Sequence, residues 1–305
     1  MQKRKIRNFK TLLLVMYESV RYHINSILPE SWYPAALKFW YFCSYRGRKH
    51  LDLKKPRTLN EKTQWLKLYD HSPLKTRLAD KYEVREWVRE QIGEKYLTNI
   101  LGVWNDVSEI DFSALPQRFV LKATHGSGMN IIVKNRDELD VKAAKKEMKS
   151  WLKTNIAYHG LELCYRDIKP RIIAEEYMEN LNGDLYDYKI WCFNGKPSYI
   201  MFLAERASGL KMVFFDPQWN RMPFTYYPRY EAEVKKPECL DQLLELAAKL
   251  SRDFALARVD FYVLNDNTIK FGEITFYSAG GWANWQPPEW DLRLGDMLTL
   301  PKARI

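Results

Sequence analysis

Two carboxylates near the C-terminus, Asp260 and Glu273, are spaced so that they could share one ligand. They lie in two runs rich in Val, Ile, Phe and Tyr that flank the turn-forming residues 265–267, which is the pattern of a β-hairpin. Opposed residues in a hairpin have Cβ atoms about 5 Å apart. Carboxylates that close repel each other unless one is protonated or a cation lies between them. Mg²⁺ suits this position because it takes carboxylate oxygens and keeps places for phosphate. The alternative is a polar surface with an Arg–Asp ion pair.

The register of this hairpin follows from its loop. If residues 265–268 form the loop, alternation of side chains places the paired residues on one face of the hairpin. The expected pairs are Leu264 with Ile269, Tyr262 with Phe271, Asp260 with Glu273, and Arg258 with Thr275. The opposite, apolar face then holds Val259, Phe261 and Val263.

A glycine-containing loop, ATHGSGMN, lies between two further strand-like runs at residues 119–122 and 131–135. Gly126 and Gly128 would let backbone N–H groups approach phosphate closely, and Ser127 would add a hydroxyl donor. This is not a Walker P-loop, because no Gly-Lys-Ser/Thr is present and no helix follows directly. The alternative is an ordinary glycine hairpin.

Two more strand patterns lie between the loop and the carboxylate hairpin. Residues 171–178 are expected to form one strand, and the Asn194-Gly195 turn predicts a hairpin around it. Asp187 and Lys189 are two residues apart, so they share a face. They could bind a ligand or form an ion pair at the surface.

In this order, five short motifs resemble the ATP-grasp superfamily. They are Asp80-Lys81, Lys122 with the glycine loop, the IAEEY run at 173–177, the DYK run at 187–189, and RVD…GEIT at 258–275. The run FGEITFYSAGG resembles more narrowly the TupA-like ATP-grasp family of bacterial surface polysaccharide clusters. The superfamily resemblance covers about residues 78–281 and the family resemblance most of 45–295.

The resemblance implies an α+β fold in which two lobes with antiparallel sheets grip ATP. It implies a basic helical N-terminal region at 1–77 and an ATP-grasp domain at 78–295, with a lid at about 119–175. A C-terminal tail at 296–305 would follow.

The resemblance also implies roles for individual residues. Lys122 would meet the α- and β-phosphates, Glu175 would contact the nucleotide through its side chain, and Asp187 would contact the ribose. Residues expected to bind ATP are Lys81, Lys122, His125, Gly126, Ser127, Gly128, Glu175, Asp187, and, through their main chain, Glu176 and Met178. Residues expected to hold Mg²⁺ are Asp260, Glu273 and Thr275, the last of which replaces the usual asparagine. Arg258 and Lys189 would be catalytic, and Arg206, Ser278 and Gly280 would contact substrate.

The implied activity is Mg-ATP-dependent carboxylate–amine ligation through an acylphosphate. The carboxylate would be a uronic acid of a bacterial surface polysaccharide, and the amine an amino acid or another amine. An ATP-grasp kinase acting on a sugar, a glycosyltransferase and a non-catalytic binding module are the alternatives. The sequence has no convincing Asp-x-Asp nucleotide-sugar site, which argues against a glycosyltransferase. The presence of Lys122, Asp260 and Glu273 argues against a non-catalytic module.

The charge of the chain is concentrated near its start. The 305 residues carry a formal charge of +10, and residues 1–60 contain 13 Lys/Arg against 3 Asp/Glu. The rest of the chain is therefore neutral, which argues against a body that coats nucleic acid and for a basic arm that meets an anionic surface. Four cysteines without CxxC spacing indicate free thiols in a reducing cytosol.

Apolar residues recur at helical spacing in residues 1–28. They are Ile6, Phe9, Leu13, Met16, Tyr17, Val20, Ile24 and Ile27. The apolar run is far shorter than the roughly 20 residues of a membrane span, and no signal-peptide cleavage site is evident. This helix either packs its apolar face on the body or lies on anionic lipid at the inner face of the cytoplasmic membrane.

Overall fold

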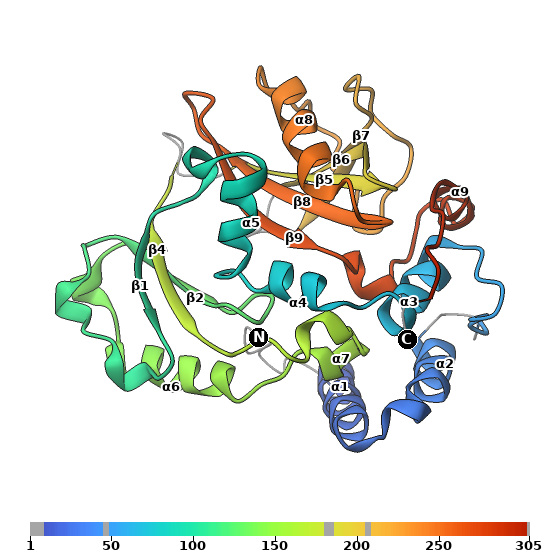
Figure 1. Ribbon diagram of the computed structural model, residues 1–305, viewed down its shortest axis with the longest axis horizontal. Coiled ribbons are helices and arrows are strands. Elements are labelled where there is room, and N and C mark those ends of the chain that lie inside the picture. The colour runs from blue at the N-terminus through green and yellow to red at the C-terminus, as the bar shows by residue number, and fades with distance from the viewer. Residues whose placement is uncertain (1–8, 45–48, 180–185, 205–208, 304–305) are drawn as a thin grey trace. The chain divides into compact units, whose positions relative to one another are not determined.

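The computed structural model describes residues 9–44, 49–179, 186–204 and 209–303, and these form two compact units (Figure 1). Unit 1 contains Met1–Trp40, His71–Arg85 and Thr98–Met178, and unit 2 contains Tyr41–Asp70, Glu86–Leu97 and Glu179–Ile305. Each unit has an antiparallel sheet with helices, so the α+β prediction is confirmed. Residues 1–77 are divided between the two units, and residue 77 lies inside a segment of unit 1 rather than at the end of a unit.

Unit 1 is built on a sheet with strand order β1-β4-β2-β3. Its strands are β1 (Ile100–Trp104), β2 (Phe119–Ala123), β3 (Asn130–Val133) and β4 (Ile172–Glu176). Its helices are α1 (Phe9–Ile27), the first part of α2 (Tyr33–Ser44), α4 (Pro73–Ala79), α6 (Val141–Leu152) and α7 (Ala157–Gly160). Helix α5 (Val84–Gln91) begins in unit 1 and ends in unit 2.

The core of unit 1 lies between this sheet and α6. Strand β2 alternates between buried and half-buried residues, so Phe119, Leu121 and Ala123 enter the core while Val120 and Lys122 lie on the opposite face. Helix α6 contributes Met148 and Trp151, which are spaced to lie on one helical face. The face that carries Lys122 is therefore turned away from the core.

Unit 2 is built on a sheet with strand order β7-β6-β5-β8-β9. Its strands are β5 (Tyr186–Phe193), β6 (Lys196–Ala204), β7 (Lys211–Phe215), β8 (Leu256–Val263) and β9 (Ile269–Thr275). Its helices are α3 (Leu59–Tyr69), α8 (Leu240–Ser251) and α9 (Trp290–Met297). Helix α8 lies across β5, β6 and β8 and covers the apolar face of the sheet (Figure 1).

The β8–β9 hairpin confirms the expected pairing at the end that carries Arg258 and Asp260 and corrects it near the turn. Asp260 pairs with Glu273 and Arg258 with Thr275, but a β-bulge then shifts the register. As a result Phe271 pairs with Phe261 rather than with Tyr262, and Ile269 pairs with Val263 rather than with Leu264. The bulge places one extra residue on β9 at Gly272, where an added Cβ would lie 3.1 Å from the carbonyl oxygen of Asp260.

The four cysteines are free. Cys164, Cys192 and Cys239 are buried as expected, whereas Cys43 is exposed. Burial raises the pKa of the Cys192 thiol to about 12, which keeps this thiol protonated and unreactive.

Candidate active site

A row of five charged side chains crosses β5, β8 and β9 in unit 2. Lys189 on β5 pairs in register with Asp260 on β8, and Asp260 pairs with Glu273 on β9. Asp187 and Arg258 lie two residues before Lys189 and Asp260, so all five side chains share one face of the sheet. The face on the other side carries the apolar residues under α8. The alternation of side chains between the two faces of the sheet therefore brings these five charged residues together on three neighbouring strands.

The guanidinium of Arg258 joins the two facing carboxylates. Its Nε donates to Asp260 Oδ1 and its Nη2 to Asp260 Oδ2, both at 2.7 Å, and Nη2 also donates to Glu273 Oε1 at 3.0 Å. On the other side, Lys189 Nζ lies 2.7 Å from Asp187 Oδ2 and also contacts Asp260 Oδ2. The ion pairs of Asp260 and of Asp187, which were considered as surface pairs in the alternative interpretation, are buried, because these carboxylates are only 2% and 7% exposed.

Burial and pairing act against each other in this row. Burial raises the pKa of Asp260, while the Arg258 and Lys189 cations favour its charged form. Burial would lower the pKa of Arg258, but Asp260 and Glu273 outweigh that effect and raise it above its usual value. Arg258 therefore stays a cation at every physiological pH.

The residues expected to hold Mg²⁺ present the oxygen ligands that this ion prefers. The Glu273 side chain is 32% exposed, and Thr275 Oγ1 donates to its Oε1 at 3.3 Å. In the described part of the chain, no three His, Cys, Asp or Glu side chains are grouped so as to hold a metal ion by themselves. Two carboxylates and a hydroxyl fit an ion that takes its other ligands from phosphate and water. The donor set therefore fits Mg²⁺ bound together with a nucleotide.

The glycine loop between β2 and β3 in unit 1 is tied to the Asp80-Lys81 segment. Lys81 Nζ donates to the carbonyl oxygen of Gly126 at 2.9 Å, and the Lys81 backbone N–H donates to that of Thr124 at 3.0 Å. Gly128 has φ +68°, a conformation that glycine adopts without strain. Ser127 and Gly128 are exposed, so the tip of the loop presents backbone and hydroxyl groups to solvent.

His125 supports this loop from below. It is 2% exposed, and its Nε2 donates to the carbonyl oxygen of Trp151 on α6 at 2.9 Å, which makes Nδ1 the unprotonated nitrogen. Burial lowers the pKa of His125, so the ring is neutral near pH 7. The expected contact between His125 and ATP stays a prediction, while the contact with α6 anchors the loop.

Lys122 and Glu175 form an ion pair on the face of the unit 1 sheet opposite the core. Lys122 Nζ contacts Glu175 Oε2, and Arg85 Nη1 lies 3.8 Å from Glu175 Oε1. In register, Val120 lies between Glu175 and Ile132, and Ile132 is 58% exposed. This face thus offers an exposed apolar surface beside charged groups, which suits a base next to its phosphates.

We expect Lys122→Ala to weaken ATP binding by about tenfold to a hundredfold, because a charged hydrogen bond to phosphate contributes about 1.5–3 kcal/mol. The same change leaves nearly buried Glu175 without one cation, so the apo protein should also melt lower. Lys122→Ala combined with Glu175→Gln should recover stability without recovering affinity. Calorimetric titration and thermal melting measure the two effects. Recovery of affinity in the double variant would contradict a phosphate role for Lys122.

The structure gives less information about three other residues that were predicted to bind ATP or substrate. The Glu176 backbone N–H donates to the Asn99 carbonyl oxygen at 3.1 Å, and its carboxylate accepts from the Asn99 backbone and side chain. A main-chain contact from Glu176 to adenine would therefore use its carbonyl oxygen. The role of Met178 stays a prediction, and Arg206 lies outside the described residues.

Sequence reasoning missed a buried polar stripe on α3 that holds the Ser278–Gly281 turn. Gln64 Nε2 donates to the carbonyl oxygens of Gly280 and Gly281 at 3.1 and 2.7 Å, and Lys67 Nζ contacts that of Gly280. Asn60 Nδ2 donates to the Ala283 carbonyl oxygen at 2.8 Å. Polar residues at helical spacing in an otherwise ordinary helix were the available signal. The turn expected to contact substrate is thus fixed through its backbone.

A pocket of about 500 Å³ opens beside Arg258 and Lys189 within unit 2. Its other walls are apolar, aromatic and amide side chains. They are Met201, Leu203, Leu210, Met212, Tyr226, Tyr227, Ala279, Trp282, Ala283 and Asn284. The wall residues within 201–227 were not predicted to bind a ligand, because none of them belongs to a motif, whereas Ala279 lies in the run FGEITFYSAGG. The lining has two cations and no carboxylate.

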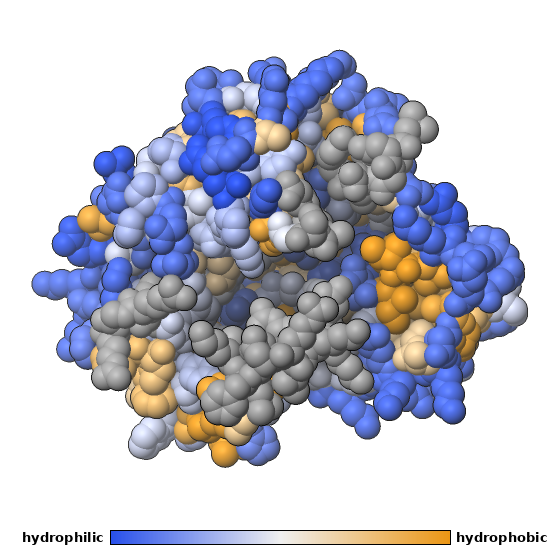
Figure 2. Space-filling view, turned by 180° about the vertical axis from the view of Figure 1, so that it is seen from behind, coloured by the Kyte–Doolittle hydropathy of each residue, from blue (hydrophilic) through white to orange (hydrophobic). Residues whose placement is uncertain are grey.

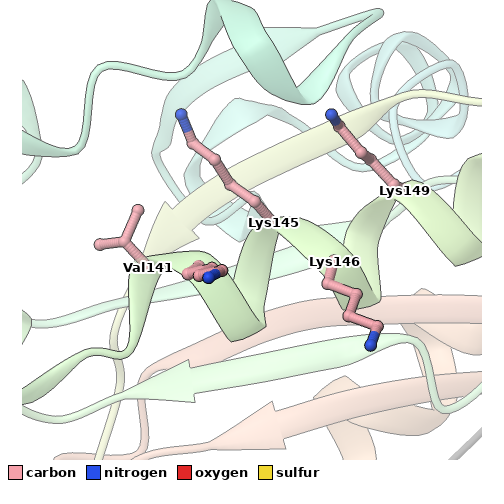
Figure 3. A pocket seen from close by; sticks show the side chains of 5 residues that line it. Val141, Lys145, Lys146 and Lys149 are labelled. Carbon is pink, nitrogen blue, oxygen red and sulfur yellow. The ribbon is translucent and has the colours of Figure 1, made fainter.

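A second hollow, of about 600 Å³, lies along α6 in unit 1 and has a different character (Figure 3). It is lined by Val141, Lys142, Lys145, Lys146 and Lys149. Figure 3 shows the ammonium groups of Lys145 and Lys149 pointing to one side of the helix and that of Lys146 to another. Such a lining has no carboxylate, hydroxyl or thiol. Lys142, Lys146 and Lys149 are exposed, so this is a solvated lysine face.

The chain is similar in fold to several solved structures. N5-carboxyaminoimidazole synthetase from Staphylococcus aureus is 12% identical, with a TM-score of 0.41, and the match covers 74% of this chain and 53% of that chain. D-alanine–D-alanine ligase from Bacillus anthracis, complexed with ATP, is 14% identical, with a TM-score of 0.41 and 78% and 66% covered. D-cycloserine synthetase is 13% identical, with a TM-score of 0.42 and 74% and 70% covered. The chain spans about half the length of the carboxyaminoimidazole synthetases that it matches.

A comparison with curated protein sequences found no match. The model of the family described as TupA-like ATPgrasp, however, matches residues 61–299. This match covers most of the chain and includes the glycine loop, Lys122 and the whole row of charges on β5, β8 and β9. The chain therefore belongs to the TupA-like ATP-grasp family.

Proposed function

We propose that this protein is a Mg-ATP-dependent ligase that joins an amine to a carboxylate through an acylphosphate. The observation that carries the proposal is the buried row of charges in which Arg258 joins Asp260 and Glu273 beside a pocket without acids. Such a row is costly to bury unless it binds a highly charged ligand or is completely paired. The exposed part of Glu273 and the open pocket favour a ligand.

The groups that would bind ATP are held in place by contacts within their own unit. Lys122, Lys81 and the backbone N–H groups at the tip of the glycine loop would contact phosphate oxygens, as backbone amides do in other anion sites. Asp187 would contact the ribose hydroxyls, and Lys189 the γ-phosphate. Magnesium held by Asp260, Glu273 and Thr275 would neutralise charge on the triphosphate when bound.

The reaction needs no nucleophilic side chain. A carboxylate oxygen of the substrate attacks the γ-phosphorus, the bond to the ADP oxygen breaks, and an acylphosphate forms. The nitrogen of the amine then attacks the acyl carbon, inorganic phosphate leaves, and the nitrogen loses a proton. Arg258, which stays charged, stabilises the negative charge that develops on the acyl oxygens.

The carboxylate substrate would occupy the pocket beside Arg258. With Mg²⁺ bound at Asp260 and Glu273, the two cations that line the pocket would favour an anion, and the aromatic rings of Tyr226, Tyr227 and Trp282 suit the apolar face of a sugar ring. Asn284 could orient hydroxyl groups. These features support a uronic acid of a surface polysaccharide or its precursor, handled in the cytoplasm together with an amino acid or other amine.

Trapping of the intermediate tests this function. The protein is incubated with Mg-ATP and a uronoside, and hydroxylamine is supplied in place of the amine. We expect release of ADP and inorganic phosphate together with a uronoside hydroxamate, which mass spectrometry identifies. Incubation with a pool of amines should then give the amide.

The control is the matching neutral glycoside, which has no carboxylate and should give neither hydroxamate nor phosphate release above background. A γ-phosphate that remains on the sugar as a stable ester would contradict ligation and indicate a kinase. Transfer of a sugar from a nucleotide sugar, without use of ATP, would indicate a glycosyltransferase.

A further inference from the structure

Helix α1 packs on unit 1 through its polar side. The Asn25 side chain is completely buried, donates to the carbonyl oxygen of Tyr158 at 2.8 Å and accepts from Trp40 Nε1 at 2.9 Å. The hydroxyl of Tyr22 accepts from the backbone N–H of Asn155 at 3.3 Å, and Arg21 is only 8% exposed. Among the described side chains of α1, those of Tyr22 and Asn25 therefore fix the helix through hydrogen bonds.

Five aliphatic residues of α1 are exposed on the other side. Exposed fractions are 47% for Leu13, 54% for Met16, 52% for Val20, 37% for Ile24 and 72% for Ile27. At about 100° per residue these five side chains fall within an arc of about 80°, roughly opposite Asn25. The amphipathic helix is thus turned around, with its polar side on the protein and its apolar side in solvent. We refer to these five residues as the apolar stripe.

The apolar stripe lies at one edge of unit 1. Figure 2 shows apolar side chains in the region where Figure 1 draws α1 and α2. Just beyond the end of α1, the indole of Trp32 is 61% exposed. Apolar side chains gathered in this way on a protein surface mark a contact with another molecule.

Charge indicates which molecule this is. Residues 1–60 contain the whole +10 of the chain, and in the sequence Lys3, Arg4, Lys5, Arg7 and Lys10 directly precede the stripe. An aliphatic stripe with a basic cluster at one end and a tryptophan at the other has the composition of a helix that lies in the headgroup region of an anionic membrane. None of the described helices is long and apolar enough to cross a membrane, so the contact would be peripheral.

We propose that the apolar stripe docks on an anionic phospholipid surface. The aliphatic side chains enter the boundary between headgroups and acyl chains, while the basic residues meet lipid phosphates. Unit 1 stays folded in this contact, because the residues that hold α1 to it are on the opposite side of the helix. The alternative in which this helix packs its apolar face on the body does not hold for the five residues of the stripe, because they are exposed.

Sedimentation of the full-length protein with vesicles tests the proposal. The protein should bind phosphatidylcholine vesicles that contain phosphatidylglycerol and should leave pure phosphatidylcholine vesicles largely unbound. Binding should weaken when salt is raised from about 0.1 M to about 1 M, because the Debye length falls from about 10 Å to about 3 Å. Equal binding to both vesicles at every salt concentration, or no binding to either, would overturn the proposal.

Substitutions on α1 distinguish an effect of the apolar stripe from a general effect of added negative charge. Val20→Glu and Ser19→Glu add the same charge at neighbouring exposed positions, but only the first interrupts the stripe. Val20→Glu should weaken binding at least about tenfold more than Ser19→Glu, because only it removes an apolar side chain from the contact. Met16→Glu should repeat the effect, and all three variants should melt as the wild type does.

Two further outcomes identify other occupants. If Lys146→Glu on α6 abolishes vesicle binding while Val20→Glu does not, the α6 lysines are the contact and the stripe is not. If light scattering shows a wild-type dimer that Val20→Glu converts to a monomer, and vesicles bind neither form, the stripe is an interface between two copies. Either outcome overturns the proposal.

Discussion

Glu273→Gln is expected to lower ATP turnover by roughly a hundredfold or more while leaving the fold intact. The substitution removes the charge of a group proposed to hold Mg²⁺, and loss of one such electrostatic contact commonly costs that much. Stability should fall by only about 1 kcal/mol, because the amide oxygen can still accept from Arg258 and Thr275. Phosphate release and thermal melting measure the two quantities.

A matched control is available at the turn of the same hairpin. Glu238 accepts from Asn267 Nδ2 at 2.9 Å, and Glu238→Gln makes the same chemical change outside the row of charges. It should leave turnover near the wild-type value. Turnover in Glu273→Gln that matches this control would remove Glu273 from the proposed metal site.

Arg258→Met should have the largest effect on both stability and activity. Asp260 would lose two hydrogen bonds and one of its two neighbouring cations, and a buried ion pair that loses one partner destabilises a protein by about 3–5 kcal/mol. Turnover should also fall by roughly a hundredfold or more, because no charge would stabilise the acyl oxygens. Urea denaturation and phosphate release report the two losses separately.

The double variant Arg258→Met with Asp260→Asn tests the structural part of this loss. Removing both charges should recover much of the lost stability, while turnover stays low because Asp260 is also a proposed Mg²⁺ ligand. Arg252→Met is the control, since Arg252 pairs with Asp253 at the surface and its side chain is 63% exposed. A double variant that regains turnover together with stability would show that Arg258 serves only to pair with Asp260.

The pairing of Asp260 with Glu273 could be predicted from the sequence because it depends on local patterns alone. Two runs of alternating residues and a turn determine which side chains share a face and which oppose each other. The glycine loop between two strands was predictable for the same reason. Family motifs then assigned chemistry to both.

The register of the rest of the hairpin was not predictable, because the alternation of residue types does not reveal where a β-bulge inserts an extra residue. Gly272 adds one residue to β9, so Phe271 moves from the polar face to the apolar face, where its ring lies 6.3 Å from that of Phe261. The burial of Phe271 beside Phe261 favours this shift over the regular register. Packing against residues distant in the sequence thus decided the register near the turn.

Partners of the charged and polar side chains also came only from the tertiary structure. The sequence places Arg258 and Lys189 on strands of unknown order, and only the β5-β8-β9 arrangement brings both to Asp260. In the same way, only the tertiary structure shows that Gln64 and Lys67 of α3 contact the backbone of the turn at Gly280.

Helix α1 illustrates the general limit. The sequence determined that Leu13, Met16, Val20, Ile24 and Ile27 share one side, because helical periodicity is a local property. It could not determine whether that side is covered, because burial depends on where Tyr158, Trp40 and Asn155 lie in the folded chain. The hydrogen bonds that these residues make with Asn25 and Tyr22 hold the opposite side of α1 against the protein, and they leave the apolar side exposed.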